Sequence, residues 1–193
     1  GLMIILGRTK ETERLRNAYK SEYSSFVAVY GRRRIGKTFL IRETFDYKFA
    51  FQHAGISKGT KEEQIKEFCK SILKAGYKEI SEKDFVYPDN WLEAFYLLEK
   101  FLLTLPKGKK RVFIDELSCM DTQKSGLVTA LENFWNGWAS ARKDIMLIVC
   151  ASATSWMLDN IIHNKGGLYN RLTERIHLDP FTLKECKEFI KSN

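Results

Sequence analysis

Short, uninterrupted apolar runs alternate along this chain with longer segments in which apolar residues recur every three or four positions. The runs Phe26–Tyr30, Val112–Ile114 and Ile145–Cys150 contain no alternating polar residues, which is typical of strands covered on both faces. Segments with helical spacing are 61–73, 91–102 and 125–141. Buried strands separated by amphipathic helices predict an α/β fold around a central, mainly parallel sheet.

Weaker patterns predict the remaining elements. They are a strand or extended arm at Leu2–Leu6, a helix at Thr9–Tyr19 with Thr9 as its N-cap, a strand at Lys48–Gln52, a connector at Lys74–Tyr87, a helix at Trp156–Ile162, a strand at Ile176–Leu178 and a helix from Thr182. Asp89 or Asn90 is expected to cap the helix that starts at Trp91, since either side chain can accept a hydrogen bond from a free N–H of the first turn.

The segment from Gly31 to Thr38, Gly-Arg-Arg-Arg-Ile-Gly-Lys-Thr, fits the phosphate-loop spacing G-x-x-x-x-G-K-S/T at every fixed position. It follows the predicted strand Phe26–Tyr30 and precedes a predicted helix at Thr38–Phe45, which is the order that the motif requires. Gly31 and Gly36 permit a close approach of phosphate, and main-chain N–H groups meet it at the positive end of the helix. The segment therefore predicts a nucleotide site.

The side chains of this loop divide into two groups. Lys37 is expected to reach the β- and γ-phosphate oxygens, and the Thr38 hydroxyl to occupy one coordination position on Mg²⁺. Arg32, Arg33 and Arg34 hold variable positions and cannot all face one phosphate, so we expect them to be solvated or paired with acids, with one of them steering nucleotide or a partner. The alternative is an ordinary strand-to-helix turn, which the correct flanks disfavour.

Two carboxylates follow the apolar run Val112–Ile114. Asp115 is expected to hold Mg²⁺, directly or through a coordinated water, and Glu116 to orient and polarise the water that attacks the γ-phosphate. Such a strand end is common when taken alone, and it becomes specific when a phosphate loop precedes it. The alternative for Glu116 is a helix cap or a solvent-exposed side chain.

Two further positions are candidates for contact with the γ-phosphate. Ser152 follows the apolar run Ile145–Cys150, where its hydroxyl could bond the attacking water or the phosphate, or could equally cap the next helix. Arg171 or Arg175 could bring positive charge to the γ-phosphate, from this subunit or from a neighbour. A surface ion pair is the commoner role of an arginine.

Composition narrows the class of protein. The chain has 193 residues, 44% hydrophobic and 29% charged, a one-domain length with no apolar run long enough to cross a bilayer. Its four cysteines form no C-x-x-C pair, so we expect free thiols in a reducing cytoplasm. A net charge of +8 is compatible with nucleic acid, but the densest cluster outside the loop, Lys107–Arg111, is better interpreted as a solvated turn than as a phosphate-binding patch.

Together these segments resemble a prokaryotic, predominantly archaeal family of P-loop ATPases related to the AAA+ and STAND nucleotide-driven switches and to origin-recognition proteins. The matching features are the Gly7-Arg8 helix start, the loop Gly31–Thr38, Trp91-Leu92-Glu93-Ala94-Phe95, Phe113-Ile114-Asp115-Glu116, Ser152 and Leu168-Tyr169-Asn170-Arg171. The resemblance implies a three-layer α/β/α sandwich of the AAA+ type, in which the Ser152 strand separates the acid-bearing strand from the phosphate-loop strand.

The resemblance also implies the ligands. ATP and Mg²⁺ are the expected cofactors, with nucleotide contacts from residues 31–38 and Phe39, and with Gly7 and Arg8 beside the adenine. Ala151 stands where the family more often has glycine before the serine. Family members usually continue into a helical lid and a further domain, so residues 1–193 are expected to form a single ATPase domain without those parts.

These observations favour an Mg²⁺-dependent ATPase whose cycle drives a conformational switch. A P-loop kinase is a second reading, although such kinases usually lack a glutamate after the strand-end acid, so Glu116 argues against it. A third is a nucleotide-gated module that binds DNA or protein with little turnover, through a C-terminal domain or as a homo-oligomer. No membrane partner is expected.

Overall fold

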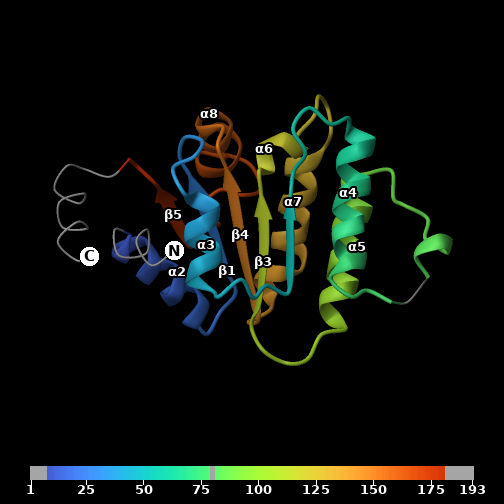
Figure 1. Cartoon of the computed structure of the whole chain (residues 1–193), viewed down its shortest axis with the longest axis horizontal. Coiled ribbons are helices and arrows are strands. Elements are labelled where there is room, and N and C mark those ends of the chain that lie inside the picture. The colour runs from blue at the N-terminus through green and yellow to red at the C-terminus, as the bar shows by residue number, and fades with distance from the viewer. Residues whose placement is uncertain (1–7, 79–80, 181–193) are drawn as a thin grey trace.

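A five-stranded, entirely parallel sheet forms the centre of the computed structural model, which describes residues 8–78 and 81–180 (Figure 1). The strands are β1 (Ser25–Tyr30), β2 (Phe51–Ala54), β3 (Lys110–Asp115), β4 (Ile145–Ala151) and β5 (Glu174–His177). Their order in the sheet is β2-β3-β4-β1-β5. The strand that carries Ser152 at its end thus lies between the acid-bearing strand and the phosphate-loop strand, which confirms the expected order.

Helices cover both faces of this sheet. They are α2 (Thr9–Lys20), α3 (Lys37–Thr44), α4 (Lys61–Lys74), α5 (Trp91–Leu103), α6 (Leu117–Met120), α7 (Leu127–Gly137) and α8 (Thr154–Met157), with 3-10 turns at Glu82–Asp84 and Ala139–Ala141 and a π-helical turn at Leu158–Ile162. Figure 1 shows α2 and α3 on one face and α7 on the other, with α4 and α5 beside the β2 edge. No helix in these described ranges is both long and apolar enough to cross a membrane.

Alternating side chains of the three central strands, β1, β3 and β4, supply two separate cores. In β1, Phe26 and Ala28 join the larger cluster with α4, α5 and α7, whereas Val27 and Val29 join the smaller cluster with α2 and α3. Every residue of β4 is buried, as expected for a central strand of a parallel sheet covered on both faces. The three-layer α/β/α sandwich is therefore confirmed.

Local sequence signals set several helix boundaries. Asn90 caps α5 by accepting a hydrogen bond from the Glu93 N–H at 2.9 Å, which decides between Asp89 and Asn90. Thr60 and Glu63 form a reciprocal capping box at the start of α4. The predicted cap Thr9 is wrong, because Thr9 is the first helical residue of α2 and Arg8 occupies the cap position.

Several other boundaries differ from the prediction, among them that of the last strand, which is Glu174–His177 rather than Ile176–Leu178. The second strand begins at Phe51 rather than Lys48, because Asp46 and Tyr47 take left-handed backbone angles that prolong the turn after α3. Helix α7 is shorter than 125–141, since Gly126 is left-handed and the helix ends at Gly137. The helix predicted from Trp156 begins at Thr154. The elements predicted at Leu2–Leu6 and from Thr182, together with Gly7, lie outside the described residues.

Candidate nucleotide-binding site

The ends of β1, β3 and β4 meet at one edge of the sheet. Tyr30 pairs with Ala151, and Ile114 pairs with Val149, so the loop after β1 and the acids after β3 flank the tip of β4. In an open parallel sheet this edge, at the carboxyl ends of the strands, is where ligands bind. The register therefore brings together three segments that are far apart in the sequence.

The loop between β1 and α3 has the backbone that a phosphate loop needs. Gly36 precedes α3 with φ of 96°, a left-handed angle that favours glycine. At Gly31 a Cβ would clash with the carbonyl oxygen of Leu178, which follows β5. Both glycines are thus required by geometry, one by its backbone angle and one by a close approach.

Lys37 turns back over its own loop. Its side chain is buried, and Nζ donates hydrogen bonds to the carbonyl oxygens of Gly31 at 2.8 Å and Arg32 at 2.7 Å. The ammonium group is consequently held inside the curve of the loop, where it can exchange these carbonyls for phosphate oxygens.

Thr38 and Asp115 lie in direct contact. The Thr38 hydroxyl donates to Oδ2 of Asp115 at 2.6 Å, and the main-chain N–H of Glu116 donates to Oδ1 at 2.8 Å. A hydroxyl and a carboxylate are hard oxygen donors of the kind that Mg²⁺ prefers. Within residues 8–78 and 81–180 no group of three or more His, Cys, Asp or Glu could hold a metal. The oxygens of Thr38 and Asp115 fit an ion that takes its remaining ligands from phosphate and water.

Glu116 has both carboxylate oxygens engaged by neighbours. Oε1 accepts a hydrogen bond from the Ser152 hydroxyl at 3.0 Å, and Oε2 accepts one from the Cys119 thiol at 3.8 Å. The backbone of Glu116 is left-handed, with φ of 50°, an uncommon angle for a residue with a side chain. Neither Glu116 nor Ser152 uses its side chain as a helix cap: Glu116 makes no capping bond to α6, and Ala153 takes the cap position of α8.

The three arginines of the loop point away from internal partners. Arg32, Arg33 and Arg34 are exposed, and none forms an ion pair with the described residues. The positive charge of Arg33 lowers the pKa of Cys119, an effect that is smaller than the rise caused by burial and by Glu116. Ile35 is half-buried and packs against the core cluster of α2 and α3, and Phe39 is half-buried in the first turn of α3.

The other predicted arginines differ in placement, and Arg8 is the one that bonds a segment at this same edge of the sheet. Arg171 and Arg175 are exposed, and neither guanidinium forms an ion pair within the described ranges. Arg8 is buried and donates to the carbonyl of Asp179, just after β5. It therefore ties the start of α2 to the segment that follows the last strand.

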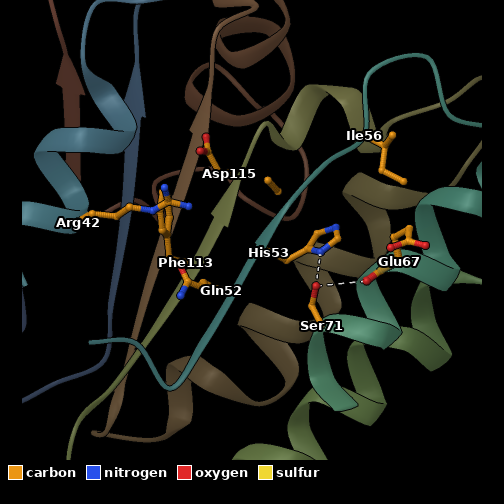
Figure 2. A pocket seen from close by; sticks show the side chains of 9 residues that line it. Arg42, Gln52, His53, Ile56, Glu67, Ser71, Phe113 and Asp115 are labelled. Carbon is orange, nitrogen blue, oxygen red and sulfur yellow. Dashed lines mark hydrogen bonds between the residues drawn. The ribbon is translucent and has the colours of Figure 1, made fainter. Parts of the chain in front are cut away.

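A cavity of about 260 Å³ lies beside Asp115, at the β2 edge of the sheet (Figure 2). Its lining residues are Arg42, Gln52, His53, Ala54, Ile56, Glu67, Ser71, Phe113 and Asp115. His53 Nδ1 lies 2.7 Å from the Ser71 hydroxyl, and burial lowers the pKa of His53 to about 4, so its imidazole is neutral at physiological pH. No pattern in the sequence predicts this cavity, because its residues come from α3, β2, β3, α4 and the segment after β2.

Sequence reasoning also missed Cys119. Nothing in the spacing of the cysteines separates Cys119 from Cys69 and Cys150, yet of these three only Cys119 forms a hydrogen bond with Glu116. The signal available in the sequence was its position three residues after Glu116, which is one helical turn if a helix starts there.

Comparison with known proteins places the chain among ATPases. Residues 5–193 match the model of an ATPase domain predominantly from Archaea. An uncharacterized protein of Methanocaldococcus jannaschii is 23% identical over 186 residues, which cover 96% of this chain and 38% of that protein. The chain thus spans well under half the length of this relative.

Solved structures share the fold at low sequence identity. The Walker-type ATPase of Pyrococcus abyssi has a TM-score of 0.66 at 20% identity, covering 96% of this chain and 57% of that one. The ORC1 protein of Aeropyrum pernix, in complex with DNA, has a TM-score of 0.59 at 12% identity, with coverage of 96% and 47%. The Cdc6p protein of Pyrobaculum aerophilum has a TM-score of 0.59 at 14% identity, with coverage of 95% and 48%. The family match covers nearly the whole chain and includes the loop and both acids, and the chain belongs to this predominantly archaeal family of ATPase domains.

Proposed function

We propose that this domain binds ATP with Mg²⁺ and hydrolyses its γ-phosphate. The observation that carries the proposal is the meeting of Lys37, Thr38, Asp115, Glu116 and Ser152 at one edge of the sheet, with hydrogen bonds joining Thr38 to Asp115 and Glu116 to Ser152. A structural role alone would not require a buried lysine, a left-handed glutamate and a strand-end serine at the same point.

Each residue would perform one part of the reaction. The N–H groups of the loop and the Lys37 ammonium would hold the β- and γ-phosphates, while Thr38 and Asp115 would hold Mg²⁺. The ion, when bound, supplies positive charge that offsets the charge developing on the transferred phosphoryl group. Glu116 would accept a proton from the attacking water and aim its oxygen at phosphorus, and the Ser152 hydroxyl would bond that water or the γ-phosphate.

The contacts within the protein also suggest how nucleotide would act as a switch. Lys37 bonds two loop carbonyls, and Thr38 bonds Asp115. Nucleotide and Mg²⁺ would replace these partners, so that the loop and the strand ends are joined through the ligand rather than directly. A change at this edge with nucleotide state is the switch that we propose, and an arginine such as Arg171 or Arg175 from a second copy could respond to it.

Substitution of Glu116 by glutamine tests the assignment most directly. Glu116→Gln keeps the shape of the side chain but removes the proton acceptor, so we expect turnover to fall by about 10²-fold or more while ATP affinity stays within a few-fold of wild type. Phosphate release and ATP binding would be measured on the same preparation. Unchanged turnover in Glu116→Gln would show that Glu116 has no role in the reaction. Turnover without added Mg²⁺ would show that the reaction does not need the metal.

A second candidate function is nucleotide-gated binding of DNA. It is favoured by one relative, the Aeropyrum pernix ORC1 protein, whose structure is a complex with DNA, and by the net charge of +8 in this chain. If it holds, retention on duplex DNA should change between ATP and ADP at fixed salt. Retention that ignores nucleotide and disappears in modest salt would indicate nonspecific charge alone.

A further inference from the structure

A cysteine touches the glutamate that we assign to catalysis. Cys119 lies in the short helix α6, and its Sγ is 3.8 Å from Oε2 of Glu116. The other oxygen, Oε1, is bonded by Ser152 at 3.0 Å. Two donors from different elements therefore reach the two oxygens of one carboxylate, which fixes the rotation of the carboxylate plane as well as its position.

We propose that Cys119 is a positioning residue for Glu116, acting with Ser152 to set the orientation of its carboxylate toward the attacking water. The inference rests on the proposed function of Glu116. Each carboxylate oxygen has two lone pairs, so one donor at each oxygen leaves capacity for a bond from water. The protein donors thus orient the acceptor without occupying all of it.

The chemistry of the thiol suits this role. Burial and the nearby charge of Glu116 raise the pKa of Cys119, so the sulfur carries its proton at neutral pH and can donate it. A thiol is a weak donor, and it withdraws little charge from the carboxylate. The thiol therefore orients the Glu116 carboxylate through one weak hydrogen bond and leaves its other lone pairs open to water.

Gly55, the residue after β2, packs directly behind Glu116 and Cys119. A Cβ on Gly55 would clash with the carbonyl oxygen of Glu116 and would lie 2.9 Å from Met120 Cγ and 3.1 Å from Cys119 Cβ. The Gly55 N–H also donates to the carbonyl of Asp115 at 2.9 Å. The segment from Glu116 to Met120 consequently packs directly on the β2 backbone and has no room to move back.

A buried glutamine, Gln64, holds the segment at Gly55 in place. Gln64 is fully buried in α4, and its side-chain amide accepts from the Ile56 N–H at 3.0 Å and donates to the Ile56 carbonyl at 2.6 Å. This pair of bonds fixes the residue that follows Gly55 to the first turns of α4. The backbone that carries Glu116 and Cys119 therefore packs against Gly55, and the residue after Gly55 is in turn bonded to Gln64 of α4.

Kinetics of Cys119→Ala test the positioning role. We expect kcat to fall by about 3- to 10-fold while KM and the Kd for ATP stay within about twofold, because the substitution disturbs the acceptor of the water proton and no group that holds the nucleotide. Cys69→Ala is the matched control: Cys69 is buried in α4 and should leave kcat unchanged once the folded fraction is accounted for.

A double-mutant cycle separates positioning from general damage. If Cys119 acts through Glu116, adding Cys119→Ala to Glu116→Gln should lower kcat no further, since the acceptor is already absent. An additional 3- to 10-fold fall in the double variant would overturn the proposal, because it would show an effect that does not pass through Glu116.

Thiol alkylation provides a measurement that needs no turnover. The charge of Glu116 raises the pKa of Cys119, so Glu116→Gln should increase the rate of iodoacetamide reaction at Cys119 several-fold, measured on the cysteine peptides by mass spectrometry, with Cys69 and Cys150 as buried references. Equal rates would contradict the contact. Wild type without ATPase activity would sink the proposed function, whereas normal Glu116-dependent activity in Cys119→Ala would sink only the role of Cys119.

Discussion

Two lysines at opposite ends of the sheet make the same kind of contact and serve different purposes. Lys37 donates to the carbonyls of Gly31 and Arg32 within its own loop. Lys109 donates to the carbonyls of Ala18 at 3.1 Å, Ser21 at 2.9 Å and Tyr23 at 2.7 Å, where α2 ends. Lys37 thus joins residues of one turn, whereas Lys109 joins segments that are about 90 positions apart in the chain.

The difference shows what distinguishes a cation available to a ligand from one committed to the fold. The partners of Lys37 belong to a loop whose N–H groups can bind phosphate, so a ligand can replace them at little cost. The partners of Lys109 are carbonyls at and just after the negative end of α2, and the Lys109 ammonium bonds all three of them at once. Charge density in the sequence is similar in both regions and does not separate them.

The predicted solvated turn at Lys107–Arg111 needs a correction for the same reason. Lys110 is buried and donates to the carbonyl of Gly108 and to Asp144, each at 2.9 Å. Arg111 donates to the carbonyl of Lys48 at 2.7 Å and lies over the rings of Tyr19 and Phe45. Lys107 is exposed, so three of the four cations in this turn stabilise the fold rather than face solvent.

Removal of the Lys37 ammonium should have the largest effect, and it should weaken ATP binding with little change in the stability of the fold. We expect Lys37→Ala to weaken ATP binding by about 10²-fold or more, because the loop loses its charge-assisted bond to the phosphates. The free energy of unfolding in urea should change by less than about 1 kcal/mol, since the two carbonyls can bond water. If the free energy of unfolding fell by as much as the free energy of ATP binding, Lys37 would stabilise the fold as Lys109 does, and the proposed difference between the two lysines would be wrong.

Removal of the Lys109 ammonium should have the opposite profile. Lys109→Met keeps the aliphatic stem but removes the bonds to three carbonyls, of which only Ala18 keeps a second donor among the described residues, the Ser25 hydroxyl, so we expect a loss of about 1–2 kcal/mol in the free energy of unfolding. ATP affinity and kcat should stay within about twofold of wild type. Lys107→Met, at an exposed position of the same turn, is the control and should change stability by less than about 0.5 kcal/mol.

A smaller effect should distinguish the exposed cations of the two regions. Arg33→Gln and Lys107→Gln each remove one positive charge, but only Arg33 lies in the phosphate loop. At low ionic strength we expect Arg33→Gln to raise the KM for ATP by about 2- to 5-fold, and Lys107→Gln to leave it unchanged. The effect of Arg33→Gln should shrink in about 0.5 M salt because screening weakens long-range attraction. Equal effects of both substitutions would mean that net charge, rather than position, attracts nucleotide.

The smallest effect concerns the acid that pairs with Lys110. The Arg142 guanidinium, and then Lys110, lower the pKa of Asp144 to about 2 from its usual 3.8. A carboxylate with a lowered folded-state pKa contributes stability above the unfolded pKa, and this contribution is lost as pH falls through about 4 toward 2. Asp144→Asn should therefore cost about 0.5–1 kcal/mol at pH 7, a modest value because the ion pairs are partly exposed, with the difference from wild type narrowing below pH 4. A cost that persists unchanged at pH 3 would point to packing.

The parts of the fold that the sequence predicts are those set by local pattern. The order of strand, glycine loop and helix, the two central strands and the capped helix at Trp91 each depend on residues within one short segment. The family resemblance supplied the order of the strands. The shift of the second strand depended on two left-handed residues, Asp46 and Tyr47, of which only Asp46 is of a type that favours turns.

The site was predictable where it consists of motif residues and not where it depends on tertiary contacts. Lys37, Thr38, Asp115 and Glu116 follow from spacing, whereas their roles remain predictions until activity is measured. Other contacts arise from backbone geometry or from segments distant in sequence. They are the bond from Cys119 to Glu116, the close packing at Gly55 and the carbonyls that bond Lys109. The pattern of residue types along the chain does not indicate which distant segments come within contact distance.

The close approach between Gly31 and Leu178 sets a lower limit on any minimal nucleotide-binding fragment. Leu178 donates its N–H to the Tyr30 carbonyl at 2.9 Å, and its own carbonyl fills the space where a side chain at Gly31 would stand. A fragment that stops short of this leucine would retain every residue of the phosphate motif and still lose the surface against which the motif is shaped. Domain dissection by motif content alone would therefore cut too early, and the boundary has to be drawn from the partner of the first glycine.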